Sequence, residues 1–164
     1  MNRNPVRFPG PVAFLLLALA GCLPSCASFS SASEPVWVEK EIRASNDPLL
    51  MDCTALAIQK SGFPVGSGID PGRLIAVSGW QNSLAPFRGK GYREQCEIRY
   101  TRIVPGRYKA SIRVRHEKND DILHPLDLTY AQWIPEADNV DRARTVMQHI
   151  QSLLGTGLEV GPAR

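Results

Sequence analysis

The stretch CEIRYTRIVPGRYKASIRV, residues 96–114, alternates apolar and polar side chains on both sides of a Pro-Gly pair. This alternation is typical of two strands that bury one face, and the Pro-Gly pair marks the turn between them. A three-residue loop with Gly106 in the left-handed conformation pairs Ile98 with Ile112, whereas a two-residue loop sets Ile98 against Arg113. The apolar match favours the three-residue loop, which also pairs two further apolar couples, Tyr100 with Ala110 and Cys96 with Val114.

Two segments before this hairpin also predict strands. Residues 69–73, IDPGR, contain a second Pro-Gly turn, and the same loop rule pairs Val65 with Val77 across it. Residues 36–43, VWVEKEIR, are short and rich in β-branched side chains, which is typical of a first strand. The sequence therefore predicts one strand near the start of the domain and four strands in its middle.

Two helices complete the pattern. Asn46 or Asp47 can cap the first helix, which is predicted to run to about Lys60 and to end at Gly62. One face of this helix is expected to carry Leu49, Cys53, Leu56, Ala57 and Lys60, with Leu50 beside it. Asp138 or Asn139 can cap the last helix, whose apolar stripe is Val140, Ala143, Met147, Ile150 and Leu154.

Together these elements predict an α+β fold, namely a two-layer sandwich in the order β-α-β-β-β-β-α. Its antiparallel sheet of about five strands is packed against two helices on one face. The segment from His116 to Pro135 is predicted to be irregular. A single domain is expected to cover residues 36–160, with a short tail at 161–164.

The N-terminus has the three parts of a secretory signal peptide. Arg3 and Arg7 form a basic region, the apolar run VAFLLLALA follows at residues 12–20, and small residues come next. A helix of about 9–12 apolar residues spans roughly 14–18 Å, which is too short to cross about 30 Å of hydrocarbon. The sequence therefore predicts that residues 1–21 are a cleaved signal peptide.

Residues 19–22, Leu-Ala-Gly-Cys, resemble the lipobox of bacterial lipoproteins. The resemblance implies that the Cys22 sulfur carries a diacylglyceryl group and that cleavage occurs before this residue. Cys26 follows Leu-Pro-Ser and matches the motif less well. Residue 23 is Leu and not Asp, so the same resemblance favours the periplasmic face of an outer membrane. The serine-rich residues 22–35 are then a lipidated tether.

The arrangement of the domain is similar to the helix-grip modules of outer-membrane assembly lipoproteins and to that of the lipopolysaccharide-transport lipoprotein. This resemblance rests on the order of helices and strands, and it departs in having four strands between the helices where the simplest module has three. It implies a binding or scaffold role in envelope assembly.

Charge argues against a nucleic-acid partner. Without residues 1–21 the chain keeps 17 basic and 16 acidic side chains, whereas nucleic-acid-binding domains are usually strongly basic. One sheet face is nevertheless rich in cations, which suggests that it could bind an anionic lipid or an acidic protein partner. The candidate anion-binding side chains are Lys90, Arg93, Arg99, Lys109, Arg113 and Arg115. Glu97 is expected opposite Arg113, where it can neutralise that charge, and a merely solvated face is the alternative.

Two cysteines of the domain are placed to meet. Cys53 on the first helix and Cys96 on the sheet both face the predicted core. In an oxidising compartment they form either a disulfide, worth about 3–4 kcal/mol, or two buried free thiols. The sequence leaves both alternatives open.

Catalytic signals are weak. Residues 116–124, with two histidines and several carboxylates, suggest a metal or acid–base site, but they contain no known metal-ligand spacing. Trp80 falls on the polar side of its strand, as an exposed contact residue or as the sign of a bulge. We therefore predict a lipid-anchored, non-catalytic envelope protein without a cofactor or metal. The alternative is a periplasmic hydrolase or metal-binding protein that uses residues 116–124.

Overall fold

The structure is a computed structural model that describes residues 34–66, 68–85 and 89–155. The predicted signal peptide, the lipidation site Cys22, nearly all of the predicted tether and the C-terminal tail lie outside the described residues.

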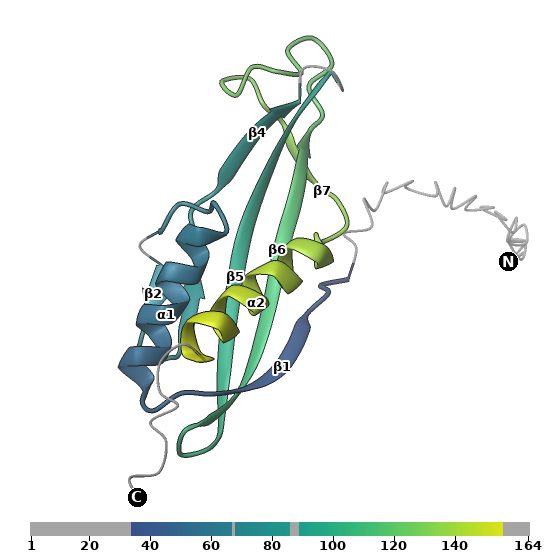
Figure 1. The fold of residues 1–164 in the computed structure, drawn as a ribbon. Helices are drawn as coiled ribbons and strands as arrows, with labels where there is room; N and C mark the ends of the chain where they lie inside the picture. Colours follow the sequence, from purple (N-terminus) through teal and green to yellow (C-terminus); the bar gives the residue numbers. More distant parts are fainter. Residues whose placement is uncertain (1–33, 67, 86–88, 156–164) are drawn as a thin grey trace, which may run out of the picture. The chain divides into compact units, whose positions relative to one another are not determined.

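Two helices and seven strands make up the described part of the chain (Figure 1). In chain order they are β1 (Val38–Arg43), α1 (Asp47–Lys60), β2 (Gly68–Asp70), β3 (Ile75–Val77), β4 (Gln81–Ala85), β5 (Lys90–Val104), β6 (Arg107–Asn119), β7 (Trp133–Pro135) and α2 (Val140–Gly155). No helix among these residues is long and apolar enough to cross a membrane.

The strands form one antiparallel sheet in the order β1-β6-β5-β3-β2, with β4 also paired to β5 and β7 to β6. Both helices cover the same face of this sheet, which we call the inner face, and the opposite face is the outer face (Figure 1). The predicted two-layer α+β sandwich is therefore confirmed. The sheet has more strands than expected because β4 is separate from β3 and because β7 lies in the segment predicted to be irregular.

The long hairpin of β5 and β6 has the predicted register, with Ile98 opposite Ile112. Gly106 has a φ of +78°, as its position in the turn requires. The pairing shifts by one residue at the turn, where Val104 stands opposite Arg107 and Ile103 is left without a partner. The extra residue is a β-bulge beside the turn.

The predicted register of the first hairpin is wrong, because Gly68 and not Val65 stands opposite Val77. Asp70 Oδ1 accepts a hydrogen bond from the Arg73 backbone N–H at 3.1 Å, which lengthens the turn. Leu74 then adopts the left-handed conformation, with a φ of +55°, and its side chain is buried. Burial of a leucine side chain here offsets the strain of its backbone.

A bulge separates β3 from β4. Three residues, Ser78 to Trp80, stand opposite two residues of β5, Gln95 and Cys96, between the β3 and β4 pairings. The Ser78 hydroxyl accepts the Cys96 backbone N–H at 2.9 Å and so replaces a lost ladder bond. The alternative in which Trp80 marks a bulge is therefore the one that the structure contains.

Both helices begin at the predicted caps. Asn46 Oδ1 accepts the Leu49 N–H at 2.9 Å, and Asn139 Oδ1 accepts the Arg142 N–H at 3.1 Å. The apolar stripe of α2 buries Ala143, Met147 and Ile150 as predicted. The buried face of α1 is rotated from the expected one, because Leu56 is 53% exposed. The side chains that it does bury are Leu50, Met51, Cys53, Thr54, Ala57 and Ile58.

Candidate functional site

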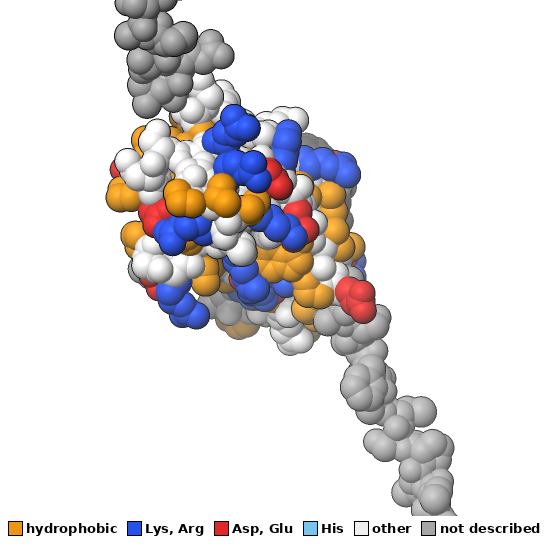
Figure 2. All heavy atoms as spheres, turned by 90° about the horizontal axis from the view of Figure 1, so that it is seen from below, with side chains coloured by type: hydrophobic (Ala, Val, Ile, Leu, Met, Phe, Trp, Pro, Cys, Tyr) orange, Lys and Arg blue, Asp and Glu red, His pale blue; other side chains and the backbone are white. Residues whose placement is uncertain are grey.

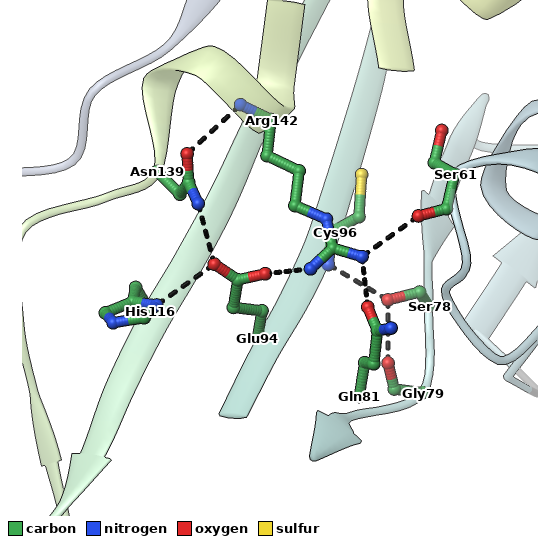
Figure 3. Close-up of polar contacts among 9 residues, drawn as sticks. All are labelled: Ser61, Ser78, Gly79, Gln81, Glu94, Cys96, His116, Asn139 and Arg142. Atoms are coloured by element: carbon green, nitrogen blue, oxygen red, sulfur yellow. Dashed lines mark hydrogen bonds and ion pairs between the residues drawn. The ribbon is translucent and has the colours of Figure 1, made fainter. Parts of the chain in front are cut away.

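A polar cluster lies where the start of α2 meets the inner face of the sheet (Figure 3). Glu94 of β5 is its centre, and we call the group the Glu94 cluster. Its other members come from three elements far apart in the sequence: Gln81 of β4, His116 of β6, and Asn139 and Arg142 at the start of α2.

Arg142 joins four parts of the fold. Its guanidinium donates to the Glu94 carboxylate, to the Gln81 side-chain oxygen, and to the Ser61 carbonyl just after α1 at 3.0 Å. The Arg142 Cζ atom also lies 4.3 Å from the ring centroid of Phe63. This cation–π contact and the charge-assisted hydrogen bonds fix the helix layer on the sheet.

Glu94 is held as an ionised carboxylate. Its side chain is 10% exposed, and it accepts hydrogen bonds from Asn139 Nδ2 at 2.8 Å and from His116 Nδ1 at 3.0 Å. Burial works to raise the pKa of Glu94, but the contacts with Asn139, Arg142 and His116 outweigh it and lower the pKa. The carboxylate therefore orients His116 and does not serve as a proton donor near neutral pH.

A pocket of about 310 Å³ opens beside this cluster. Its lining residues are Gln81, Ser83, Tyr92, Arg93, Glu94, His116 and Arg142. The His116 ring stacks on Tyr92, with 5.2 Å between centroids, and its Nε2 lies 3.5 Å from Glu136 Oε2. Among the described residues, the hydrogen-bond and ion-pair partners of the His116 side chain are the carboxylates of Glu94 and Glu136.

The residues of the alternative hypothesis, a metal or acid–base site at 116–124, are divided between separate places. His116 faces the Glu94 cluster, whereas His124 lies 3.5 Å from Asp121 and packs on the Tyr130 ring. Glu117 is on the outer face, where it binds arginines. In the residues that the structure describes, no group of three or more His, Cys, Asp or Glu side chains could hold a metal ion.

Five of the six predicted anion-binding cations lie on the outer face, and each is bound to a carboxylate. The pairs are Arg93 and Arg115 with Glu117, Arg99 with Glu97, Lys109 with Glu39, and Arg113 with Asp138. Glu97 stands opposite Arg113 as expected, but its ion pair is with Arg99. Lys90 is exposed at the start of β5. These internal pairs leave little free positive charge for an anion.

All three tryptophans of the chain lie beside arginines of the outer face, an arrangement that sequence reasoning missed. The Arg93 guanidinium lies between two rings, 4.2 Å from the Trp80 centroid and 4.6 Å from the Trp133 centroid. Arg99 lies 4.6 Å from the Trp37 centroid. The available signal was the position of Trp80 on the polar side of its predicted strand, close in sequence to a hairpin rich in arginine. The half-buried rings leave aromatic surface on the outer face.

Cys53 and Cys96 are both buried and both free in the structure. Burial raises the pKa of Cys96 to about 12, and burial also raises the pKa of Cys53. Of the two alternatives that the sequence left open, the structure contains the pair of free thiols. Neither thiol is expected to react as a nucleophile near neutral pH.

The loop between β6 and β7, residues 120–132, is organised around Asn119, and we call it the apical loop. The Asn119 side chain donates to the His124 and Pro125 carbonyls and accepts the backbone N–H groups of Asp121 and Gln132. A side-chain amide has two donor hydrogens and an acceptor oxygen with two lone pairs, so this buried residue is fully satisfied. This part of the segment predicted to be irregular is thus a loop held by defined hydrogen bonds.

No family model matches the chain, and no curated protein sequence matches it.

Proposed function

We propose that this protein is a lipid-anchored cell-envelope protein whose domain is a non-catalytic binding or scaffold module for an envelope partner. The Leu-Ala-Gly-Cys motif at residues 19–22 supports the anchor and the periplasmic face of an outer membrane. The outer face of the sheet supports the binding role, and the observation that carries it is the set of tryptophans stacked with arginines.

The outer face has the chemistry of a protein-binding surface. Tryptophan and arginine are the residues most enriched among those that dominate binding energy at interfaces. Their neighbours are already paired, so a partner meets oriented polar groups and does not have to neutralise free charges. A hollow of about 220 Å³ on the side of β6, lined in part by Arg113, Arg115 and Glu117, adds a concave place for a partner side chain.

The alternative, a periplasmic hydrolase or metal-binding protein acting through residues 116–124, has less support. His116 and His124 have separate partners, and Glu94, which orients His116, is itself bound by Arg142. These contacts support a bracing role for the cluster better than a catalytic one.

A photo-crosslinking amino acid tests the binding role in intact cells. We expect a residue introduced at Thr101, on the outer face of β5, to crosslink to one defined envelope protein. The matched control is Gln148, which is exposed on α2 and faces away from the sheet. Equal crosslinking from both positions, or none from Thr101, would contradict the proposal.

A further inference from the structure

We propose that the apical loop is a second membrane contact, which inserts Ile122 and Leu123 into the bilayer that holds the anchor. The inference rests on the proposed lipid anchor at Cys22 and deepens it, because it says how the domain is oriented on the membrane.

The apical loop is the most apolar exposed part of the described chain. Ile122 is 91% exposed and Leu123 is 84% exposed. Of the eleven large apolar side chains exposed among the described residues, five lie in this loop of 13 residues. They are Ile122, Leu123, Leu126, Leu128 and Tyr130. Exposed apolar side chains gathered in this way mark a surface that another apolar phase covers.

The backbone at the tip is prepared for an apolar environment. Asp121 Oδ1 accepts the N–H groups of Leu123 and His124, at 2.8 and 2.6 Å. The Asp121 N–H is itself bound to Asn119 at 3.0 Å. A backbone donor without a partner is costly inside a bilayer, so these bonds lower the cost of inserting the tip. A tip whose Asp121, Leu123 and His124 N–H groups are bound within the loop suits a lipid phase better than it suits a pocket that must supply partners.

The tether can bring the anchor and the loop to the same bilayer. The Val36 N–H and Arg113 Nε both donate to Asp138 Oδ2, at 2.8 and 2.7 Å, so the chain enters the domain beside Arg113. From Arg113 to Asn119 strand β6 advances about 20 Å, and the loop lies at that end of the molecule (Figure 1). The twelve residues 22–33 span at most about 40 Å.

The charge of the loop selects the kind of lipid. The negative charges near the tip come from Asp120, Asp121 and Asp127. The positive charge at this end comes from Lys90, which is exposed at the start of β5. Around the tip, aspartates outnumber lysines and arginines among the residues that the structure describes, and a net negative rim is repelled by anionic headgroups. We therefore expect the loop to enter a zwitterionic bilayer, such as phosphatidylcholine, in preference to one rich in phosphatidylglycerol.

A fluorescent probe at the tip tests this contact in the full lipidated chain. Leu123→Cys is labelled with an environment-sensitive dye in a Cys26→Ser background, since Cys53 and Cys96 are buried and have raised pKa values. The protein is then reconstituted into phosphatidylcholine vesicles. We expect a blue shift and quenching by bromine on the acyl chains. The matched control is Thr101→Cys near the other end of the same hairpin, where neither is expected.

The outcomes separate the loop from the anchor. If the protein floats with the vesicles but the dye at residue 123 stays aqueous, the loop contact is overturned and the anchor stands. If the protein does not float, both are overturned. A second variant excludes misfolding. In this variant both tip residues are replaced, Ile122→Ser and Leu123→Ser, and the dye is attached at Leu128→Cys. We expect the dye to lose its quenching by the acyl chains while the unfolding temperature stays unchanged. Retained quenching would contradict the proposal.

Discussion

The two ends of the β5–β6 hairpin both expose apolar side chains, but they are bordered by opposite charges. At the turn end, residues 102–107, Ile103 and Val104 are 42% and 45% exposed beside Arg102 and Arg107. Both arginines are exposed, and they form ion pairs with Asp47 and Glu41. Seen from that end, apolar side chains are bordered by Lys and Arg (Figure 2). The apical loop is more exposed and is surrounded by aspartates. We therefore expect the charged rim, and not apolar exposure alone, to decide what each end of the hairpin binds.

The ends also differ in construction. The turn depends on one glycine and on local pairing, whereas the apical loop depends on the side chain of Asn119, which binds four backbone groups at once. A local turn should therefore tolerate substitution better than a loop built around one buried residue. The predictions below test this contrast, beginning with the largest effect.

Removing the anchor tests whether the apical loop alone can hold the protein on a membrane. We expect Cys22→Ser to abolish acyl labelling and to release the protein into the soluble fraction, because two exposed aliphatic side chains bind a bilayer only weakly compared with several acyl chains. Fractionation with fatty-acid labelling measures this. Cys26→Ser is the matched control and should behave as wild type. Persistent acyl labelling of the Cys22 variant would show that another residue is the anchor.

Asn119→Ala should damage the loop end most. It leaves the backbone N–H groups of Asp121 and Gln132 without their acceptor and removes one of two hydrogen bonds from each of the His124 and Pro125 carbonyls. We therefore expect a loss of about 3 kcal/mol in the free energy of unfolding. Urea denaturation measures the change. Asn82→Ala, at an exposed position of β4, is the control and should cost less than about 0.5 kcal/mol. A cost for Asn119→Ala as small as that of the control would mean that the loop is not organised by this side chain.

Acid should lower the free energy of unfolding by protonating Glu94, which lies on the inner face between the two ends of the hairpin. A carboxyl with a pKa below its ordinary value of 4.5 adds stability above that pH, and the stability is lost as the pH falls through the folded-state pKa. We expect Glu94→Gln to be less stable than wild type at neutral pH and to lose less stability on acidification. Denaturation midpoints across the acid range measure this, and parallel pH profiles would rule out the assigned role of Glu94.

Gly106→Ala should have the smallest effect. The residue has a φ of +78°, where a Cβ atom costs about 1 kcal/mol. The added Cβ atom would lie 3.4 Å from the Ala44 carbonyl oxygen, which is an ordinary contact distance, so the hydrogen bond from the Ala44 N–H to the Gly106 carbonyl can remain. Chemical denaturation measures the change. An effect larger than that of Asn119→Ala would reverse the contrast between the two ends.

The parts of the fold that the sequence predicted correctly depend on neighbouring residues. The register of β5 and β6 follows from alternation and a Pro-Gly turn, and the helix caps follow from Asn46 and Asn139. The errors arose where distant contacts decide the outcome. Leu74 takes a conformation usual for glycine because its side chain is buried, and Ser78 supports a bulge by binding the backbone of β5.

The candidate site was largely beyond sequence reasoning. His116 was singled out, but its partner Glu94 was not, and Arg142 is 48 residues from Glu94 in the chain. No periodicity links such residues, since only the packing of α2 on the sheet brings them together. The sequence correctly placed five of the six candidate cations on one face of the sheet. Two of these cations, Lys109 and Arg113, pair with carboxylates on β1 and just before α2, and these pairs depend on the same packing.

The position of Arg142 has a consequence for the order of folding. Its contacts reach back 48, 61 and 81 residues, to Glu94, Gln81 and Ser61. The β5–β6 hairpin, in contrast, closes over a few residues and can form early. We expect the contacts that require β4, β5 and both helices in place to form after the rate-limiting step. A substitution that removes the contacts of the Arg142 side chain should therefore speed unfolding and leave the folding rate nearly unchanged. In that case this side chain governs how long the domain stays folded.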